Sequence, residues 1–182
     1  MKKPSLSVAL FVAAWAVAIG GTACSDAPGR AEKFDRKVDR RASPGSFRKA
    51  GVSTVFEKRC GSLDCHGALE RNLRIYSKAG LRLPDSGQTT GGADTTIDEI
   101  TANYQSLMNL EPERSNEVIA GADPEELLIL KKPLELERHK GGPALKKGDV
   151  AYTCIRSWLV EDPTSAPVDA AACGDAARFP KN

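Results

Sequence analysis

Apolar side chains recur at the three- and four-residue spacing of amphipathic helices in separate stretches of the chain. One stretch covers residues 52–60, and Ser53 or Thr54 is placed to cap its start. A second stretch begins after Asp94 or Thr95, either of which can serve as the cap. Its apolar positions are Ile97, Ile100, Tyr104, Leu107 and Met108. Both patterns predict helices with one buried face.

Two further helices are predicted closer to the C-terminus. Asp123 can cap a helix that begins at Pro124, since proline suits the first turn, and Leu127, Leu128 and Leu130 supply its buried face. Residues 149–160 form the last predicted helix. Its apolar side consists of Val150, Cys154, Ile155, Trp158 and Leu159. Glycine- and proline-rich breaks separate these stretches, so the fold class is mainly α with long irregular loops.

The N-terminal residues have the pattern of an export signal. Lys2 and Lys3 precede an apolar run over 6–19, and small residues follow up to Ala23. The run is shorter than the roughly 20 residues of a membrane-spanning helix. Thr22-Ala23-Cys24 resembles the end of a bacterial lipoprotein box, which predicts a diacylated Cys24 in a lipid bilayer; ordinary cleavage after Ala23 is the alternative. The mature protein is then expected in the periplasm or attached to the outer membrane.

The rest of the chain divides into three parts. Residues 24–48 mix charged and small polar residues without apolar periodicity, which predicts a flexible tether. Residues 49–161 form the predicted domain, and residues 162–182 form a tail. Loss of Lys2 and Lys3 with the signal lowers the 26 basic residues to 24, equal to the 24 acidic residues. This balance argues against a nucleic-acid partner.

The strongest chemical motif is Arg-Cys-Gly-Ser-Leu-Asp-Cys-His-Gly, which contains Cys60, Cys65 and His66. Two thiols followed at once by an imidazole suit covalent attachment of one haem c, with His66 on the iron. The usual motif places two residues between the thiols, whereas four stand here. The second axial ligand is either His139, in a glycine-flanked loop, or Met108, and an open site is the third possibility.

The odd number of cysteines also carries information. The chain contains five, and an odd thiol in an exported protein needs a fate other than an internal disulfide. Lipidation of Cys24 and haem attachment at Cys60 and Cys65 leave Cys154 and Cys173. These two are predicted to form a disulfide, which an exported compartment favours.

Taken together, these pieces resemble a small c-type cytochrome domain of the kind found in exported myxobacterial and planctomycete proteins. The resemblance runs over about residues 49–161. Its matching pieces are Val55-Phe56, Cys65-His66-Gly67, Asp123-Pro124-Glu125-Glu126-Leu127-Leu128, Lys132-Pro133-Leu134, His139-Lys140-Gly141-Gly142 and the helix of Trp158. The resemblance implies an electron carrier rather than an enzyme, with a redox partner protein in the cell envelope. The four-residue thiol gap departs from the usual pattern.

Three other interpretations of the same residues remain open. Cys60 and Cys65 could close a local disulfide in a haem-free envelope lipoprotein that acts as an interaction module. A zinc site could use Cys60, Cys65, His66 and His139, although structural zinc usually draws on two ligand pairs. The zinc site is the weakest class. A dithiol oxidoreductase is also disfavoured, because such enzymes use a shorter Cys-x-x-Cys loop at a helix start.

Overall fold

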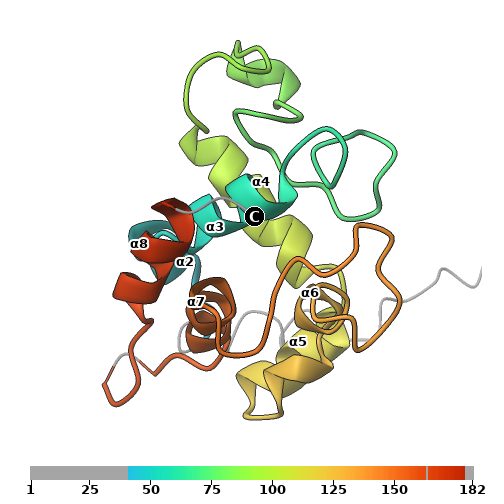
Figure 1. The fold of residues 1–182 in the computed structure, drawn as a ribbon. Coiled ribbons are helices and arrows are strands. Elements are labelled where there is room, and N and C mark those ends of the chain that lie inside the picture. The colour runs from blue at the N-terminus through green and yellow to red at the C-terminus, as the bar shows by residue number, and fades with distance from the viewer. Residues whose placement is uncertain (1–40, 163, 179–182) are drawn as a thin grey trace, which may run out of the picture.

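The computed structural model describes residues 41–162 and 164–178, and this part of the chain is built from helices and loops (Figure 1). The α-helices are α2 (Pro44–Lys49), α3 (Val52–Cys60), α4 (Ile97–Met108), α5 (Pro112–Ile119), α6 (Leu128–Lys131), α7 (Val150–Leu159) and α8 (Ala170–Arg178). Two short 3-10 turns are η1 (Pro84–Ser86) and η2 (Pro124–Glu126). Within the described ranges there is no sheet, only an isolated bridge between Asp162 and Ala166. The predicted mainly α fold class is confirmed.

An aromatic cluster forms the centre of the core. Trp158 on α7 is fully buried, and the rings of Phe47, Phe56 and Tyr104 lie with their centroids 5.0, 6.4 and 6.3 Å from it. The indole Nε1 of Trp158 donates a hydrogen bond to the Ser43 carbonyl at 3.1 Å, so its polar atom is satisfied. Four helices, α2, α3, α4 and α7, each contribute one ring, which ties them into one core.

The folded part of the chain begins earlier than the sequence analysis predicted. Helix α2 lies inside the predicted tether, and its Phe47 is fully buried against Trp158. Ser43 caps this helix through its side chain, and the buried carboxylate of Glu161 accepts hydrogen bonds from the Ser43 N–H and the Ser46 hydroxyl. The tether prediction is therefore wrong for residues 42–48. The predicted signal peptide, Cys24 and the rest of the tether lie outside the described residues.

The predicted helices over 52–60 and 149–160 correspond to α3 and α7, but the helix starts differ in detail. Gly51, with a φ of 85°, stands at the start of α3 in place of a side-chain cap. Helix α4 is capped by Thr96, which forms a reciprocal capping box with Glu99. Ile97 was expected on the buried face of this helix, but it stands at the first position of α4 and is 61% exposed. Helix α5 was not predicted, because only Ser115 and Val118 are buried in it.

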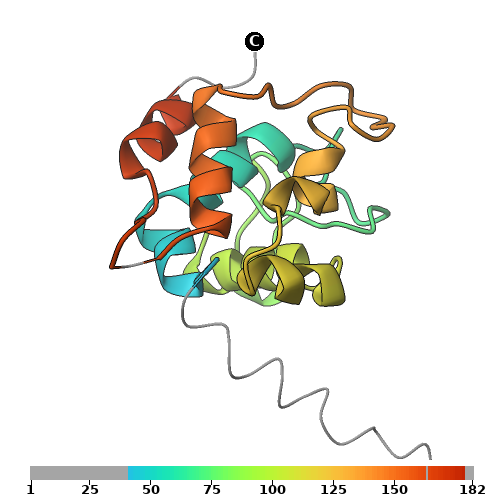
Figure 2. The ribbon, with the colours of Figure 1, turned by 90° about the horizontal axis from the view of Figure 1, so that it is seen from below.

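The C-terminal segment is not merely a tail. Residues 170–178 form α8, which packs against α7 and α3. The predicted disulfide is confirmed, since Cys154 on α7 and Cys173 on α8 are bonded with their Cα atoms 4.7 Å apart. In both ribbon views α7 and α8 lie side by side, and the long loops over 61–96 and 132–149 lie on the side of the molecule away from α8 (Figures 1 and 2).

Among the described residues, no helix has the length and apolar character needed to cross a bilayer.

Candidate functional site

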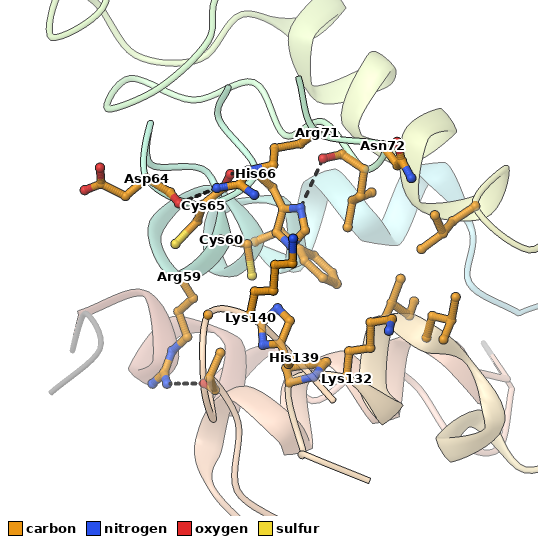
Figure 3. Close-up of a pocket in the computed structure, with 18 of the residues that line it drawn as sticks. Arg59, Cys60, Asp64, Cys65, His66, Arg71, Asn72, Lys132, His139 and Lys140 are labelled. Carbon is orange, nitrogen blue, oxygen red and sulfur yellow. Dashed lines mark hydrogen bonds between the residues drawn. The ribbon is translucent and has the colours of Figure 1, made fainter. Parts of the chain in front are cut away.

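A cavity of about 670 Å³ lies between the loops that follow α3 and α6. It is within the range of roughly 300–1,000 Å³ found for cofactor and small-molecule pockets. Cys60, Cys65, His66 and His139 all line it. Figure 3 shows the two thiols beside the His66 imidazole, with His139 across the cavity from it. The fold thus brings Cys60 and His139, which are 79 positions apart in the sequence, to one site.

Backbone hydrogen bonds fix the position of His66. Helix α3 ends at Cys60, and the chain then folds back so that the His66 N–H donates to the Cys60 carbonyl at 2.8 Å. The His66 carbonyl in turn accepts from the Ile75 N–H at 2.8 Å. The guanidinium of Arg71 donates to the carbonyls of Cys65 and Asp64 at 2.9 and 3.0 Å. The segment that contains Cys65 and His66 is therefore held from three sides.

Glycine next to His66 is required by close backbone packing. A Cβ atom at Gly67 would lie 2.1 Å from the Gly61 carbonyl oxygen, and one at Gly80 would lie 1.9 Å from the same atom. Both distances are well inside van der Waals contact, and the obstructing atom is backbone. The Ser77 hydroxyl also donates to this carbonyl at 2.6 Å. The Cys65-His66-Gly67 step can adopt its place only because Gly61, Gly67 and Gly80 lack side chains.

The loop over 132–144 presents His139. Two positions in it have left-handed backbone conformations, Glu135 with a φ of 58° and Gly142 with a φ of 68°. The N–H groups of Ala144 and Leu145 donate to the Pro133 carbonyl at 3.0 and 3.1 Å and close the loop at its base. These contacts turn His139 back over the cavity.

Each histidine hydrogen-bonds a backbone carbonyl through its Nδ1 atom. His66 Nδ1 lies 3.0 Å from the Leu73 carbonyl, and His139 Nδ1 lies 2.7 Å from the Gly142 carbonyl. A carbonyl only accepts, so Nδ1 carries the proton in the neutral ring and Nε2 keeps its lone pair. Ligating histidines in metalloproteins are usually oriented by this kind of contact.

The distance between the two imidazole rings matches that of two imidazoles bound to one metal ion. Their centroids are 6.2 Å apart and their planes differ by 11°. Two imidazoles bound end-on to opposite sides of one metal ion, each through a metal–nitrogen bond of about 2.0 Å, have centroids roughly 6 to 6.5 Å apart. Burial lowers the pKa of His66, outweighing the Leu73 hydrogen bond that raises it, and the nearby His139 and Arg71 lower it further. The neutral, ligating form is therefore favoured.

The walls of the cavity divide into an apolar part and a charged part. The apolar side chains are Phe56, Leu73, Leu110, Leu128 and Ile129. The cationic side chains are Arg59, Arg71, Lys132, Arg138 and Lys140, whereas Asp64 and Glu70 are the acidic ones. Such a site suits a flat apolar ligand that also carries negative charge. The sequence analysis did not assign Arg71, Arg138 or Lys140 to the site, although Arg138 and Lys140 flank His139 directly.

The structure also bears on the alternatives. The sulfur atoms of Cys60 and Cys65 are not joined to each other. Among the described residues, no three or more histidine, cysteine, aspartate or glutamate side chains are grouped so as to hold a metal ion, which argues against the zinc site. Met108 is buried in the core, 7% exposed, and is not among the residues that line the cavity.

Haem fits this donor set for a simple reason. The porphyrin supplies four equatorial nitrogens to the iron, so the protein needs to provide only two axial ligands. His66 and His139 could serve as these two groups, since both line one cavity and two thiols lie beside the first of them.

Comparison of the chain with protein-family models, with curated proteins and with solved structures gave no match.

Proposed function

We propose that this protein is an exported electron carrier that binds one haem c covalently through Cys60 and Cys65, with His66 and His139 as axial ligands of the iron. The observation that supports it most is the pair of imidazoles, 6.2 Å apart and nearly parallel, each hydrogen-bonded through Nδ1 so that Nε2 is available. Both thiols line the same cavity.

When bound, haem supplies a one-electron couple between ferric and ferrous iron. The attachment chemistry balances without an oxidant. The Cys60 and Cys65 sulfurs would each add to a vinyl group, so that one C–S bond forms, the vinyl π bond is lost, and the thiol hydrogen goes to the neighbouring vinyl carbon. His66 and His139 would hold the iron from its two sides. With both positions occupied by protein, substrate would be excluded from the metal, which favours electron transfer over catalysis.

The apolar wall would set the environment of the iron. Phe56 and Ile129 are 3% and 6% exposed and line the cavity together with the half-buried Leu73. A low-dielectric surrounding raises the cost of the extra charge on ferric iron, whereas two imidazoles favour ferric iron relative to a methionine ligand. The potential is set by the balance of these two effects.

The competing function, a haem-free interaction module stapled by a Cys60–Cys65 disulfide, receives less support. Its defining bond is absent from the structure, since the two sulfurs are not joined. It also gives no account of the paired Nδ1 hydrogen bonds of His66 and His139, which lie 73 positions apart in the sequence.

The proposed localisation rests only on the sequence of the N-terminal segment. We propose that Cys24 is diacylated and holds the protein on the periplasmic face of a bacterial membrane, where a redox partner of the envelope exchanges electrons with it. Fractionation of cells that produce the full chain tests this part. The protein is expected in the membrane fraction, and the Cys24→Ser variant in the soluble periplasmic fraction.

The experiment that tests the function is a reduced pyridine haemochrome spectrum of protein made in a host with c-type maturation, after acid-acetone extraction. Retained haem absorbance, lost in the Cys60→Ala/Cys65→Ala variant, is the expected result. The matched control is Cys154→Ala/Cys173→Ala, which removes two cysteines outside the cavity and should keep the haem. Absence of haem from the wild-type protein, together with oxidised Cys60 and Cys65, would instead support the haem-free module.

A further inference from the structure

The loop over 132–144 carries two cations that have no counter-ion among the residues that the structure describes. Arg138 and Lys140 flank His139 and both line the cavity. Within residues 41–162 and 164–178, neither side chain forms an ion pair or a hydrogen bond. Figure 3 shows the Lys140 side chain extending from beside His139 into the cavity in the direction of His66.

The other three cations of the cavity are already engaged. Arg59 lies 4.0 Å from a carboxylate oxygen of Asp149, and Lys132 lies 2.7 Å from one of Glu137. Arg71 donates to the carbonyls of Cys65 and Asp64. These contacts position the walls of the site. Only the two cations beside His139 remain to receive a charged group from a ligand.

Negative charge in the cavity is confined to the opposite loop. Asp64 and Glu70, the acidic residues that line the cavity, lie in the loop over 61–71 together with Arg71. The two sides of the site therefore differ in charge. A ligand with two carboxylates would be repelled from the 61–71 side and attracted to the 132–144 side, where one cation stands on each side of His139.

We infer that Arg138 and Lys140 bind the two propionate carboxylates of the tetrapyrrole, so that the cavity selects a dianionic porphyrin and fixes its orientation. This inference rests on the proposed haem function. The guanidinium of Arg138 suits a bidentate contact with one carboxylate, and the ammonium of Lys140 acts as a point charge for the other. One loop thus supplies an axial ligand and both charge partners.

The same arrangement explains why the loop carries cations without protein partners. An exposed ion pair contributes little to stability, because water screens it. A ligand that fills the cavity would exclude water from the contact and strengthen it, since charge-assisted hydrogen bonds are stronger than neutral ones.

The test compares ferric protoporphyrin IX with its dimethyl ester, which has the same ring and iron but no charged carboxylates. Binding is measured in the full chain carrying Cys60→Ala/Cys65→Ala, so that association stays reversible. Quenching of tryptophan fluorescence reports occupancy, because Trp158 lies close to the cavity: its ring is 6.4 Å from that of Phe56, which lines the cavity. We expect the acid to bind at least about tenfold more tightly than the ester.

Removal of the two cations should abolish this preference. In the Arg138→Gln/Lys140→Gln variant, the acid-to-ester affinity ratio is expected to fall to about 2 or less, through weaker binding of the acid alone. The matched control is Arg48→Gln/Lys146→Gln, which removes one exposed arginine and one exposed lysine outside the cavity and should keep the ratio.

Three results would overturn the inference, and they are distinguishable from failure of the haem function. Equal binding of acid and ester by the parent, or an unchanged ratio in the Arg138→Gln/Lys140→Gln variant, refutes the charge contact while haem binding stands. An equal loss of preference in the control variant shows a general effect of net charge. If the parent binds neither porphyrin, the haem function itself fails and the inference falls with it.

Discussion

At the residue scale, His139 and Met108 have different surroundings, and this difference favours His139 as the second axial ligand of the proposed haem. His139 lies in a loop, its Nδ1 is held by the Gly142 carbonyl, and its ring lies parallel to that of His66. Met108 is part of the packed core next to α5, where its carbonyl accepts from the Ser115 hydroxyl at 3.2 Å. Packing explains the methionine, whereas it does not explain the histidine.

We therefore expect the His139→Ala variant to change the ferric haem spectrum from low-spin to high-spin, because one axial position loses its strong-field ligand. Optical and electron paramagnetic resonance spectra at neutral pH measure this. Met108→Leu, a swap of similar volume that costs less than about 1.5 kcal/mol, should leave the low-spin spectrum unchanged. A low-spin His139→Ala protein would exclude His139 as a ligand, and a high-spin Met108→Leu protein would assign that role to Met108.

At the element scale, one buried ion pair holds the long loop before α4 onto that helix. Arg82 and Glu99 are 8% and 0% exposed, and the Arg82 Nε and Nη2 atoms donate to the two Glu99 carboxylate oxygens at 2.8 Å each. The same carboxylate accepts from the N–H groups of Leu83 and Thr96. Arg82 also donates to the Ala93 and Asp94 carbonyls. The Glu99 carboxylate therefore joins Arg82 and Leu83 of this loop to the start of α4.

This carboxylate should make the stability of the protein depend on pH in acid. Burial alone would raise the pKa of Glu99, but the hydrogen bond from Arg82 and those from the Thr96 and Leu83 N–H groups lower it to about 2. The pKa is thus lower in the folded chain than in the unfolded chain. Its stabilising contribution is complete above about pH 5 and is lost as the pH falls towards 2.

Glu99→Gln is accordingly expected to lower the free energy of unfolding by roughly 3 kcal/mol at pH 7, since it leaves Arg82 buried without its charge partner. Urea unfolding between pH 7 and pH 2 measures this, and the difference from wild type should shrink below about pH 5. Glu117→Gln is the control, because its pair with Arg114 is exposed and contributes at most about 1 kcal/mol. A difference that stays constant down to pH 2 would contradict the assignment.

The disulfide between α7 and α8 is the second link at this scale. It joins residues 19 positions apart, on helices that pack along each other on the side of the molecule away from the cavity. In the chain-entropy account, closure of a loop of this length stabilises the folded state by about 3 kcal/mol. Part of this effect arises in the unfolded chain, which the bond restricts.

Cys154→Ala/Cys173→Ala should therefore lower the free energy of unfolding by about 3 kcal/mol while the haem spectrum stays unchanged. Thermal and urea unfolding give the first quantity, and the visible spectrum of the same sample gives the second. A shifted spectrum would mean that α8 influences the cavity. Unchanged stability would mean that helix packing alone holds α8 in place.

At the scale of the whole molecule, sequence periodicity was informative where a helix buries one clear face. It located α3 and α7, because each presents three or more apolar residues to one core. It also singled out Leu128 and Leu130 of α6, a four-residue helix that buries Ile129 and Leu130. It missed α5, which buries only two residues, and it took residues 42–48 for tether, because Ala42 and Phe47 are isolated apolar residues in a polar stretch. Tertiary packing around Trp158, not local pattern, decides the structure there.

The candidate site was predictable in its residues but not in its geometry. Cys60, Cys65 and His66 are adjacent in the sequence, and His139 was singled out by its glycine-rich surroundings. No local signal could reveal that the Leu73 and Gly142 carbonyls hold the two rings, or that Gly61 and Gly80 make room for Gly67. These contacts depend on the three-dimensional path of two loops that are far apart in the chain.

If the protein binds haem as proposed, two parts of the molecule should depend on the cofactor to different extents. The aromatic core of α2, α3, α4 and α7, together with α8, is closed by packing and by a disulfide. The cavity side consists of the loops over 61–73 and 132–144, which surround a space of about 670 Å³ and contain mostly exposed or half-buried residues. Local stability follows burial and contact density, so these loops should open more readily than the core.

Hydrogen–deuterium exchange tests this division. Protein made with c-type maturation and protein made without it should differ mainly in the loops over 61–73 and 132–144, where attached haem fills the cavity and slows amide exchange by at least about tenfold. Amides of α7 and α8 should exchange alike in both, because their hydrogen bonds and disulfide do not involve the cavity. Equal slowing in α7 and α8 would show that the cofactor organises the entire fold. Slowing elsewhere with none in the two loops would place haem outside this cavity.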